Sequence, residues 1–333
     1  MTSSVKLSFC MPVYNREEFI SGAIESVLKL KNPKNYELVI VDGGSTDGTS
    51  EICQNYQKRY NKIIRYYRDK KNFGFLDGFK KCIKYSNGEY LFFLPSDDVL
   101  LLKDFSSLLK IMDKDKQISI MGTNLRLFTN DLINYSKDLI FINKTKQYKA
   151  GYDALVNWLP HSTLASVGGT IFRTVQAKKY IDQVTFANYF PMYLLAVKIL
   201  NHSDAYHYNI ISFAQRQSNQ GNQLANKQYL SLDVFNEIMS LIESKPIGKQ
   251  TINKLKREAI LSFYPSMISV RCYAPNKIFW SFIKFLLQNN LKVVLKIRFW
   301  IYLFLSVCVP KKILYWLLLY YRDNKKRFEK KLK

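Results

Sequence analysis

Acidic residues are scarce in this chain, which has 26 Asp and Glu against 50 Lys and Arg and a formal net charge of +24 over 333 residues. Such a charge attracts polyanions: nucleic acid, an anionic bilayer surface or phosphorylated substrates. Charge alone does not choose among these. Because 47% of the residues are hydrophobic, we expect one large core, or one core and a smaller helical appendage, and no extensive disorder.

Cysteine is also sparse. The five cysteines are widely spaced and include no C-x-x-C pair, so neither a zinc site nor a disulfide framework is indicated. Reduced thiols buried in a cytosolic protein are the simpler interpretation. Residues 1–6 lack a basic n-region, a long apolar stretch and a small-residue cleavage site, so we do not expect export.

No apolar run reaches the ~18 to 20 residues that a helix needs to span a bilayer. The longest runs near the C-terminus, 299–310 and 313–321, are separated by Lys311 and Lys312, are rich in Trp and Tyr, and precede a basic tail. This pattern fits an interfacial anchor attracted to an anionic membrane surface. A buried helical hairpin with a basic tail is an equally weighted alternative.

Short apolar runs alternate with amphipathic segments over the first hundred residues. We expect strands at 5–11, 36–41, 63–67 and 90–94, and helices at 17–30, 49–60 and 76–85. This alternation predicts an α/β fold, a doubly wound sheet covered on both faces. Ligands of such sheets bind at the carboxyl ends of the strands, where the loops 12–16, 42–48 and 95–98 fall.

Three carboxylates follow two of these strands. Asp97 and Asp98 come directly after the fourth strand, and such a pair can hold Mg²⁺ or Mn²⁺ against a diphosphate. Read alone, the pair is more often a turn or a helix cap. Asp42 ends the second strand, where it can accept a hydrogen bond from a nucleobase N–H while the neighbouring glycines permit close backbone approach.

Five segments together resemble family 2 of the glycosyltransferases, which has the GT-A fold. They are Phe9-Cys-Met-Pro-Val-Tyr-Asn15, Val39-Ile-Val-Asp-Gly-Gly-Ser-Thr-Asp-Gly-Thr49, Asn72-Phe-Gly74, Asn87-Gly-Glu-Tyr-Leu-Phe-Phe-Leu94 and Ser96-Asp-Asp98. The resemblance covers roughly the first 120 residues. It implies a GT-A domain over 1–228, with a nucleotide-sugar-binding half at 1–120 and an acceptor half at 121–228. The basic, hydrophobic region 229–333 would be a helical extension.

The resemblance also implies the donor site. The residues expected to bind the nucleotide sugar are Pro12, Val13, Tyr14, Asn15, Asp42, Gly44, Asn72, Gly74, Asp77 and Ser96. The expected metal ligand is Asp97, with help from Asp98, and the ion is Mn²⁺ or Mg²⁺. Pro95 stands where the commonest form of the family has a further Asp. A branch that makes surface polysaccharide has Asn there, and this chain resembles it more closely.

The acceptor side is less well marked. A general base is needed to deprotonate the acceptor hydroxyl, yet the segment 186–192 where it is expected contains no acid. Asp182 is the base by default, and His161 is a second candidate. Arg216 is a possible contact for the diphosphate. Each of these three side chains is more often structural or solvated than functional.

The sequence therefore predicts transfer of a sugar from a nucleotide-diphosphate donor to a hydroxyl of a lipid-linked glycan. The acceptor lipid would be a polyprenyl diphosphate, the product a bacterial surface polysaccharide (O-antigen or capsule), and the location the cytoplasmic face of the inner membrane. One alternative is a basic nucleic-acid-binding protein, disfavoured because no binding module is evident. The other is a nucleotidyltransferase, or a catalytically inactive homologue that binds sugar nucleotides.

Overall fold

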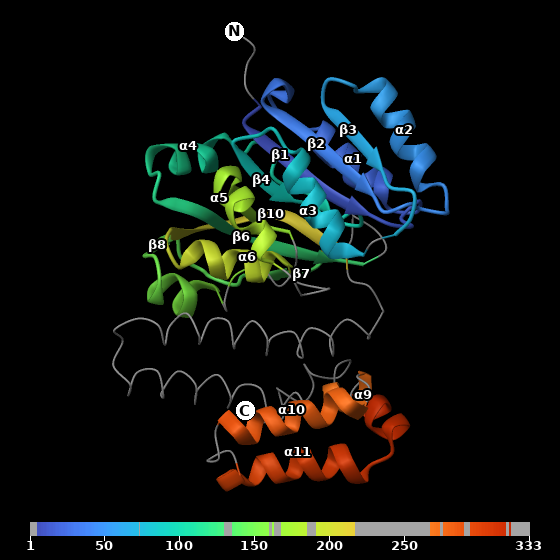
Figure 1. The fold of residues 1–333 in the computed structure, drawn as a ribbon, viewed down its shortest axis with the longest axis vertical. Coiled ribbons are helices and arrows are strands. Elements are labelled where there is room, and N and C mark those ends of the chain that lie inside the picture. The colour runs from blue at the N-terminus through green and yellow to red at the C-terminus, as the bar shows by residue number, and fades with distance from the viewer. Residues whose placement is uncertain are drawn as a thin grey trace. The chain divides into compact units, whose positions relative to one another are not determined.

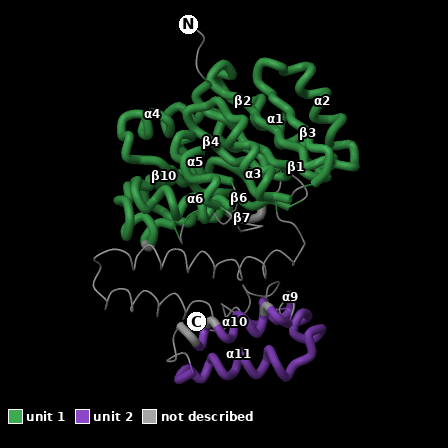
Figure 2. Tube along the Cα trace, in the orientation of Figure 1, with its two compact units in different colours: residues 1–218 green, residues 219–333 purple. Residues whose placement is uncertain are grey.

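The computed structural model describes residues 5–72, 74–129, 135–159, 162, 168–184, 191–216, 267–273, 276–289, 294–317 and 320. The chain divides into two compact units, residues 1–218 and 219–333 (Figure 2). The domain boundary expected at residue 228 falls outside the described residues and stays a prediction.

The first four strands of unit 1 are joined by helices, as the alternating sequence pattern predicts (Figure 1). The elements are β1 (Leu7–Val13), α1 (Ile20–Leu28), η1 (Pro33–Asn35), β2 (Tyr36–Asp42), α2 (Thr49–Arg59), β3 (Ile64–Arg68), α3 (Phe75–Tyr85) and β4 (Tyr90–Phe93). Strand β1 pairs in parallel with β2 and β4, and β2 pairs in parallel with β3. Their carboxyl ends therefore share one edge of the sheet.

The second half of unit 1 extends the same sheet. Its elements are β5 (Val99–Leu100), α4 (Ser106–Lys114), β6 (Ile118–Phe128), β7 (Tyr135–Leu139), β8 (Lys146–Tyr148), η2 (Asp153–Trp158), β9 (Thr170–Arg173), α5 (Thr174–Tyr180), η5 (Ile181–Gln183), α6 (Pro191–Leu200) and β10 (Asp204–Arg216). The strand order is β3-β2-β1-β4-β9-β6-β10-β5, with β7 beside β6 and β8 beside β10. Because β9 is antiparallel to both β4 and β6, the sheet is mixed. The predicted doubly wound α/β fold is confirmed.

The core of unit 1 contains a cluster of aromatic side chains from β1, β2, β4 and the residue before α4. The ring of Phe9 is fully buried and lies 5.5 to 6.0 Å, centroid to centroid, from the rings of Tyr36, Phe92 and Phe105. Tilted and edge-on pairs of this kind add to the free energy gained by burial. They fix β1, β2 and β4 together, which sets the positions of the loops that follow these strands.

A buried arginine joins the two halves of the sheet. The guanidinium of Arg173, at the end of β9, donates to the carbonyl oxygens of Met112 at 2.7 Å and Ile118 at 2.9 Å. It also donates to the Tyr90 hydroxyl at 3.2 Å and lies 3.8 Å from the Glu89 carboxylate. These bonds supply donors to buried carbonyl groups. They hold β9 between β4 and the start of β6.

Unit 2 is helical where the structure describes it. Its elements are α9 (Met267–Tyr273), α10 (Asn276–Asn289) and α11 (Ile297–Cys308). The buried side chains that pack together are Met267, Val270, Phe279, Phe282, Ile283, Leu286 and Phe299. Within the described ranges, every helix is too short or too polar to cross a membrane.

Replacing Arg173 with methionine should destabilise unit 1 by about 2 to 3 kcal/mol, because buried carbonyl groups would lose a charged donor. Urea denaturation followed by circular dichroism measures the change. The matched control is Lys116→Met, which removes a cation that is 67% exposed and 3.6 Å from the same Glu89. The control should cost less than about 1 kcal/mol. Equal losses in the two variants would show that Arg173 does not join the sheet as described.

Candidate functional site

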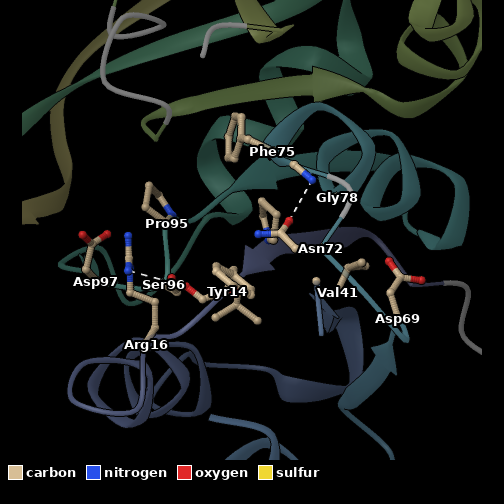
Figure 3. A pocket seen from close by; sticks show the side chains of 14 residues that line it. Tyr14, Arg16, Val41, Asp69, Asn72, Phe75, Gly78, Pro95, Ser96 and Asp97 are labelled. Carbon is tan, nitrogen blue, oxygen red and sulfur yellow. Dashed lines mark hydrogen bonds between the residues drawn. The ribbon is translucent and has the colours of Figure 1, made fainter. Parts of the chain in front are cut away.

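A cavity of about 340 Å³ lies at the sheet edge where β1, β2 and β4 end (Figure 3). The loops after these strands and after β3, together with the start of α3, line it. The lining residues are Pro12, Val13, Tyr14, Arg16, Val41, Gly43, Asp69, Asn72, Gly74, Phe75, Gly78, Pro95, Ser96 and Asp97. The structure thus brings together the three loops that the sequence placed at one edge.

The loop after β1 is tied to the loop after β2 by Asn15. This residue has a positive φ of 50°, a conformation that asparagine tolerates better than most side chains. Its Oδ1 accepts the N–H of Thr46 at 2.9 Å, and its own N–H donates to Ser45 Oγ at 3.0 Å. Asn15 therefore positions Tyr14, whose exposed ring lines the cavity, and does not line it itself.

Asp42 is fully buried and its carboxylate is occupied within the protein. One oxygen, Oδ1, accepts the N–H and the hydroxyl of Ser45 at 2.8 and 2.6 Å, and Oδ2 accepts the Tyr66 hydroxyl at 2.7 Å. Burial raises the pKa of Tyr66, and the charge of Asp42 raises it further, so the phenol remains a donor. Asp42 shapes the loop. A contact with a nucleobase would have to replace one of these bonds, and that role stays a prediction.

Gly44 brings the loop after β2 close to the loop after β3. It has a φ of +76°, and a Cβ built there would lie 3.1 Å from Lys71 Cα and 3.2 Å from the Asp69 carbonyl oxygen. A side chain at this position would be strained and would push the loops apart. Gly44 therefore acts through backbone packing, while its neighbour Gly43 lines the cavity.

The loop after β3 contributes polar groups to one side of the cavity. Asn72 Oδ1 accepts the N–H of Gly74 at 2.7 Å, and Gly74 has a φ of +88°. Asp69 lines the same side, with Oδ2 accepting from Lys81 Nζ at 2.6 Å. The predicted residue Asp77 lies in the first turn of α3 and is not part of the lining.

The turn Ser96-Asp97-Asp98 is closed by a bond from the N–H of Asp98 to the carbonyl oxygen of Pro95, at 3.1 Å. Its two carboxylates point to different places. Asp97 lines the cavity, and within the described part of the chain its carboxylate makes no hydrogen bond or ion pair. Asp98 is buried and accepts the N–H of Arg216 at 2.8 Å. Asp97 is thus placed for a ligand, and Asp98 holds the turn.

Arg216, at the end of β10, holds this turn in place. Its Nε donates to the carbonyl oxygen of Asp97 at 3.2 Å, and its guanidinium lies 4.6 Å from the rings of Phe19 and Phe128. Contacts of this kind hold a guanidinium by cation–π attraction and packing. Arg216 does not line the cavity. The structure gives Arg216 a supporting position at this turn, and its contact with the diphosphate stays a prediction.

Sequence reasoning missed two charged residues of the lining, Arg16 and Asp69. Arg16 Nη1 donates to the carbonyl oxygen of Asn15 at 2.8 Å, which holds its side chain along the loop. Figure 3 shows Asp69 and Asp97 on opposite sides of the cavity. The sequence could have indicated both residues, because each falls in a loop at the same sheet edge as Asp42.

Of the two candidate bases, the structure describes only Asp182. Asp182 is exposed in η5 and does not line it. Because β9 runs antiparallel to β4, the chain leaves β9 at the amino end of β4, where the N–H of Thr174 donates to the Glu89 carbonyl oxygen at 3.0 Å. The cavity is at the other end of β4. His161 lies outside the described residues.

A divalent ion fits this site only with help from a ligand. Among the described residues there is no group of three or more His, Cys, Asp or Glu side chains that could hold a metal. Mg²⁺ is commonly held by one or two carboxylates together with phosphate oxygens and water. The open carboxylate of Asp97 meets that requirement, so the site suits an ion that arrives with a diphosphate.

Comparison with known proteins places the first half of the chain in a described family. The family described as "Glycosyl transferase family 2" matches residues 8–175. Abequosyltransferase RfbV of Salmonella typhimurium is 33% identical over 113 residues, which are 34% of each chain. An uncharacterized glycosyltransferase of Rickettsia felis is 41% identical over 113 residues, 34% of this chain and 18% of that protein. The chain spans less than half the length of the curated relatives it matches.

Solved structures share the fold over most of the chain. The structure of S. aureus TarS 1–349 in complex with UDP matches with a TM-score of 0.56 and 16% identity, over 82% of each chain. The structure of GalNAc-T7 with UDP, GalNAc and Mn²⁺ matches with a TM-score of 0.51 and 12% identity, over 78% of this chain and 55% of that chain. The predicted GT-A fold is confirmed.

Two substitutions distinguish the structural role of the buried Asp42 carboxylate from the ligand-binding role of the Asp97 carboxylate. Asp42→Asn should lower the free energy of unfolding of unit 1 by about 1 to 3 kcal/mol, because an amide cannot accept all three buried bonds. Asp97→Asn should change it by less than about 0.5 kcal/mol, as expected for a partly exposed group without a partner. Thermal unfolding of both variants under one buffer condition tests this difference. A large loss in Asp97→Asn would contradict the assignment.

Proposed function

The chain belongs to glycosyl transferase family 2, and on that premise we propose that it transfers a sugar from a nucleotide-diphosphate donor to a hydroxyl of a lipid-linked glycan. The observation that carries the proposal is the open carboxylate of Asp97 in a cavity at the carboxyl ends of parallel strands. This is where open α/β sheets bind their ligands. The TarS structures are complexes with UDP and with UDP-GlcNAc, which supports a donor that contains a nucleoside diphosphate.

The two sides of the cavity suit the two ends of such a donor. Asp97 and Ser96 would face the diphosphate, and Mn²⁺ or Mg²⁺ held by Asp97 would supply neutralising charge to the leaving group. Asp69 and Asn72, on the loop after β3, offer acceptors and a donor for the edge of the nucleobase. The half-exposed ring of Tyr14 offers a flat surface for stacking. Arg16 would add positive charge to the lining.

The transfer itself breaks the bond between the sugar's anomeric carbon and the diphosphate oxygen. A new bond forms between that carbon and the acceptor oxygen, and the acceptor hydroxyl loses its proton. We assign the proton acceptor to none of the described residues, since the default candidate Asp182 does not line the cavity. The described residues therefore account for two parts of the mechanism, donor binding and stabilisation of the leaving diphosphate.

We further propose that the glycan acceptor is carried by a polyprenyl diphosphate and belongs to a surface polysaccharide. The relative RfbV is named for abequosyl transfer, and another relative, from Bacillus spizizenii, for glucosyl transfer to poly(ribitol-phosphate). The enzyme would work at the cytoplasmic face of the inner membrane. The net charge of +24 supports attraction to anionic lipid there.

A thermal-shift screen of nucleotide sugars, each with and without Mn²⁺, tests donor binding. A donor at 100 times its dissociation constant should stabilise the native state by about 2.7 kcal/mol, because it binds only the folded protein. We expect one nucleotide sugar to give the largest shift, with a smaller shift when Mn²⁺ is omitted. If UDP, GDP and CDP sugars all leave the unfolding temperature unchanged, the proposal is wrong.

Asp97→Asn should reduce sugar transfer at least about 100-fold, since one ligand for the leaving-group charge is lost. Release of nucleoside diphosphate in the presence of membranes carrying acceptor lipid measures the rate. Asp182→Asn is the control, and it should keep the rate within about twofold because that exposed side chain is away from the cavity. Full activity in Asp97→Asn would remove the metal assignment.

A further inference from the structure

Helix α11 presents an apolar face to solvent. Ile297, Trp300, Ile301, Phe304 and Val307 are exposed to between 46% and 72%. At 100° per residue these five positions fall within about one third of the helix circumference. They form one continuous face, which we call the outer face of α11.

The opposite side of α11 is the one that packs. Phe299 and Ser306 are buried at 1% and 0% exposure, and Phe299 joins the core of unit 2 with Phe279 and Phe282. A helix that is apolar all round is normally surrounded by protein or lipid. The outer face of α11 is therefore not explained by the packing of unit 2.

Helix α10 shows what an ordinary surface helix looks like in the same unit. Its buried side carries Phe279, Phe282, Ile283 and Leu286, and its exposed side carries Lys277, Ser281 and Lys284 together with Trp280. The polar residues face water, as amphipathic helices require. The continuous apolar exposure of α11 is thus not shared by α10.

A second exposed apolar stripe follows α11. After Pro310, residues 311–317 are helical, and Ile313, Trp316, Leu317 and Tyr320 are exposed at helical spacing. Lys311 and Lys312 precede the stripe and are exposed. Tryptophan and tyrosine prefer the boundary between water and hydrocarbon, where the ring and its polar atom are both satisfied.

The charge around these surfaces has one sign. Residues 259–322 contain no Asp or Glu and nine Lys or Arg: Arg271, Lys277, Lys284, Lys292, Lys296, Arg298, Lys311, Lys312 and Arg322. Lys296 and Arg298 flank the start of the outer face and are exposed. A second copy of this chain would bring the same positive charge to the interface and be repelled. An anionic surface would be attracted.

We propose that the outer face of α11 and the stripe 313–320 dock on an anionic lipid leaflet, with α11 lying in the plane of the interface. The 12 residues of α11 are about 18 Å long, which is too short to cross the ~30 Å hydrocarbon core. Aromatic and aliphatic side chains enter the headgroup region, and flanking lysines and arginines contact lipid phosphates. The inference rests on the proposed function only for the identity of the membrane, and it names the surface that holds the enzyme there.

Flotation of the full chain with vesicles tests the inference. With about 30% anionic lipid the chain should float, and with purely zwitterionic lipid, or in high salt, binding should fall at least about tenfold. The double variant Trp300→Ser/Phe304→Ser should lose about tenfold or more of its binding to anionic vesicles. Trp280→Ser is the matched control, since Trp280 and Trp300 are exposed to 54% and 51%, and it should bind within about twofold of the unaltered chain.

Three outcomes would overturn the inference: no flotation of the unaltered chain, equal loss in the Trp280 control, or equal binding to neutral and anionic vesicles. A change from oligomer to monomer in the double variant, with flotation unchanged, would assign the face to a second copy and also overturn it. Donor-induced thermal stabilisation of the double variant separates the two proposals. It should match that of the unaltered chain, and failure of all donors would count against the catalytic proposal alone.

Discussion

The buried carboxylate of Asp42 organises the donor side of the cavity. It ends β2, accepts two bonds from Ser45 and one from Tyr66, and its own carbonyl oxygen accepts the N–H of Asp69 at 2.8 Å. Strand β3 and the loops after β2 and β3 are thus joined through one residue. A charge at this depth is stable only because each oxygen has donors, so the loops are held in the arrangement that supplies them. The lining residues on these loops are therefore held in position by the buried Asp42.

The sequence was sufficient for the parts of the fold that depend on local pattern. The strands and helices up to β4 follow from apolar runs and helical spacing, and parallel strands joined by helices place their following loops at one edge. The insertion of β9 between β4 and β6 has no local signal, because strand order depends on pairings between distant segments. That insertion is what carries the chain past the amino end of β4 and leaves Asp182 away from the cavity.

Side-chain direction was the other limit of sequence reasoning. Asp97 and Asp98 are adjacent and chemically identical, yet one lines the cavity and the other accepts a bond from β10. The difference comes from β10, about 118 positions further along the chain. Arg216 illustrates the same point, since two phenylalanine rings from separate segments determine where its charge lies. Asp69 was missed because its importance depends on Lys81 and on the close approach that Gly44 allows.

The outer face of α11 also affects the self-association of the purified chain in solution. Several large apolar side chains in contact with water create a patch that favours self-association whenever no other surface covers it. The repulsion among the nine positive charges of residues 259–322 opposes that association at low ionic strength. Colloidal stability of the chain therefore depends on charge repulsion outweighing apolar attraction. Added salt screens the repulsion and promotes aggregation, so a low-salt buffer or a mild detergent should keep the chain dispersed.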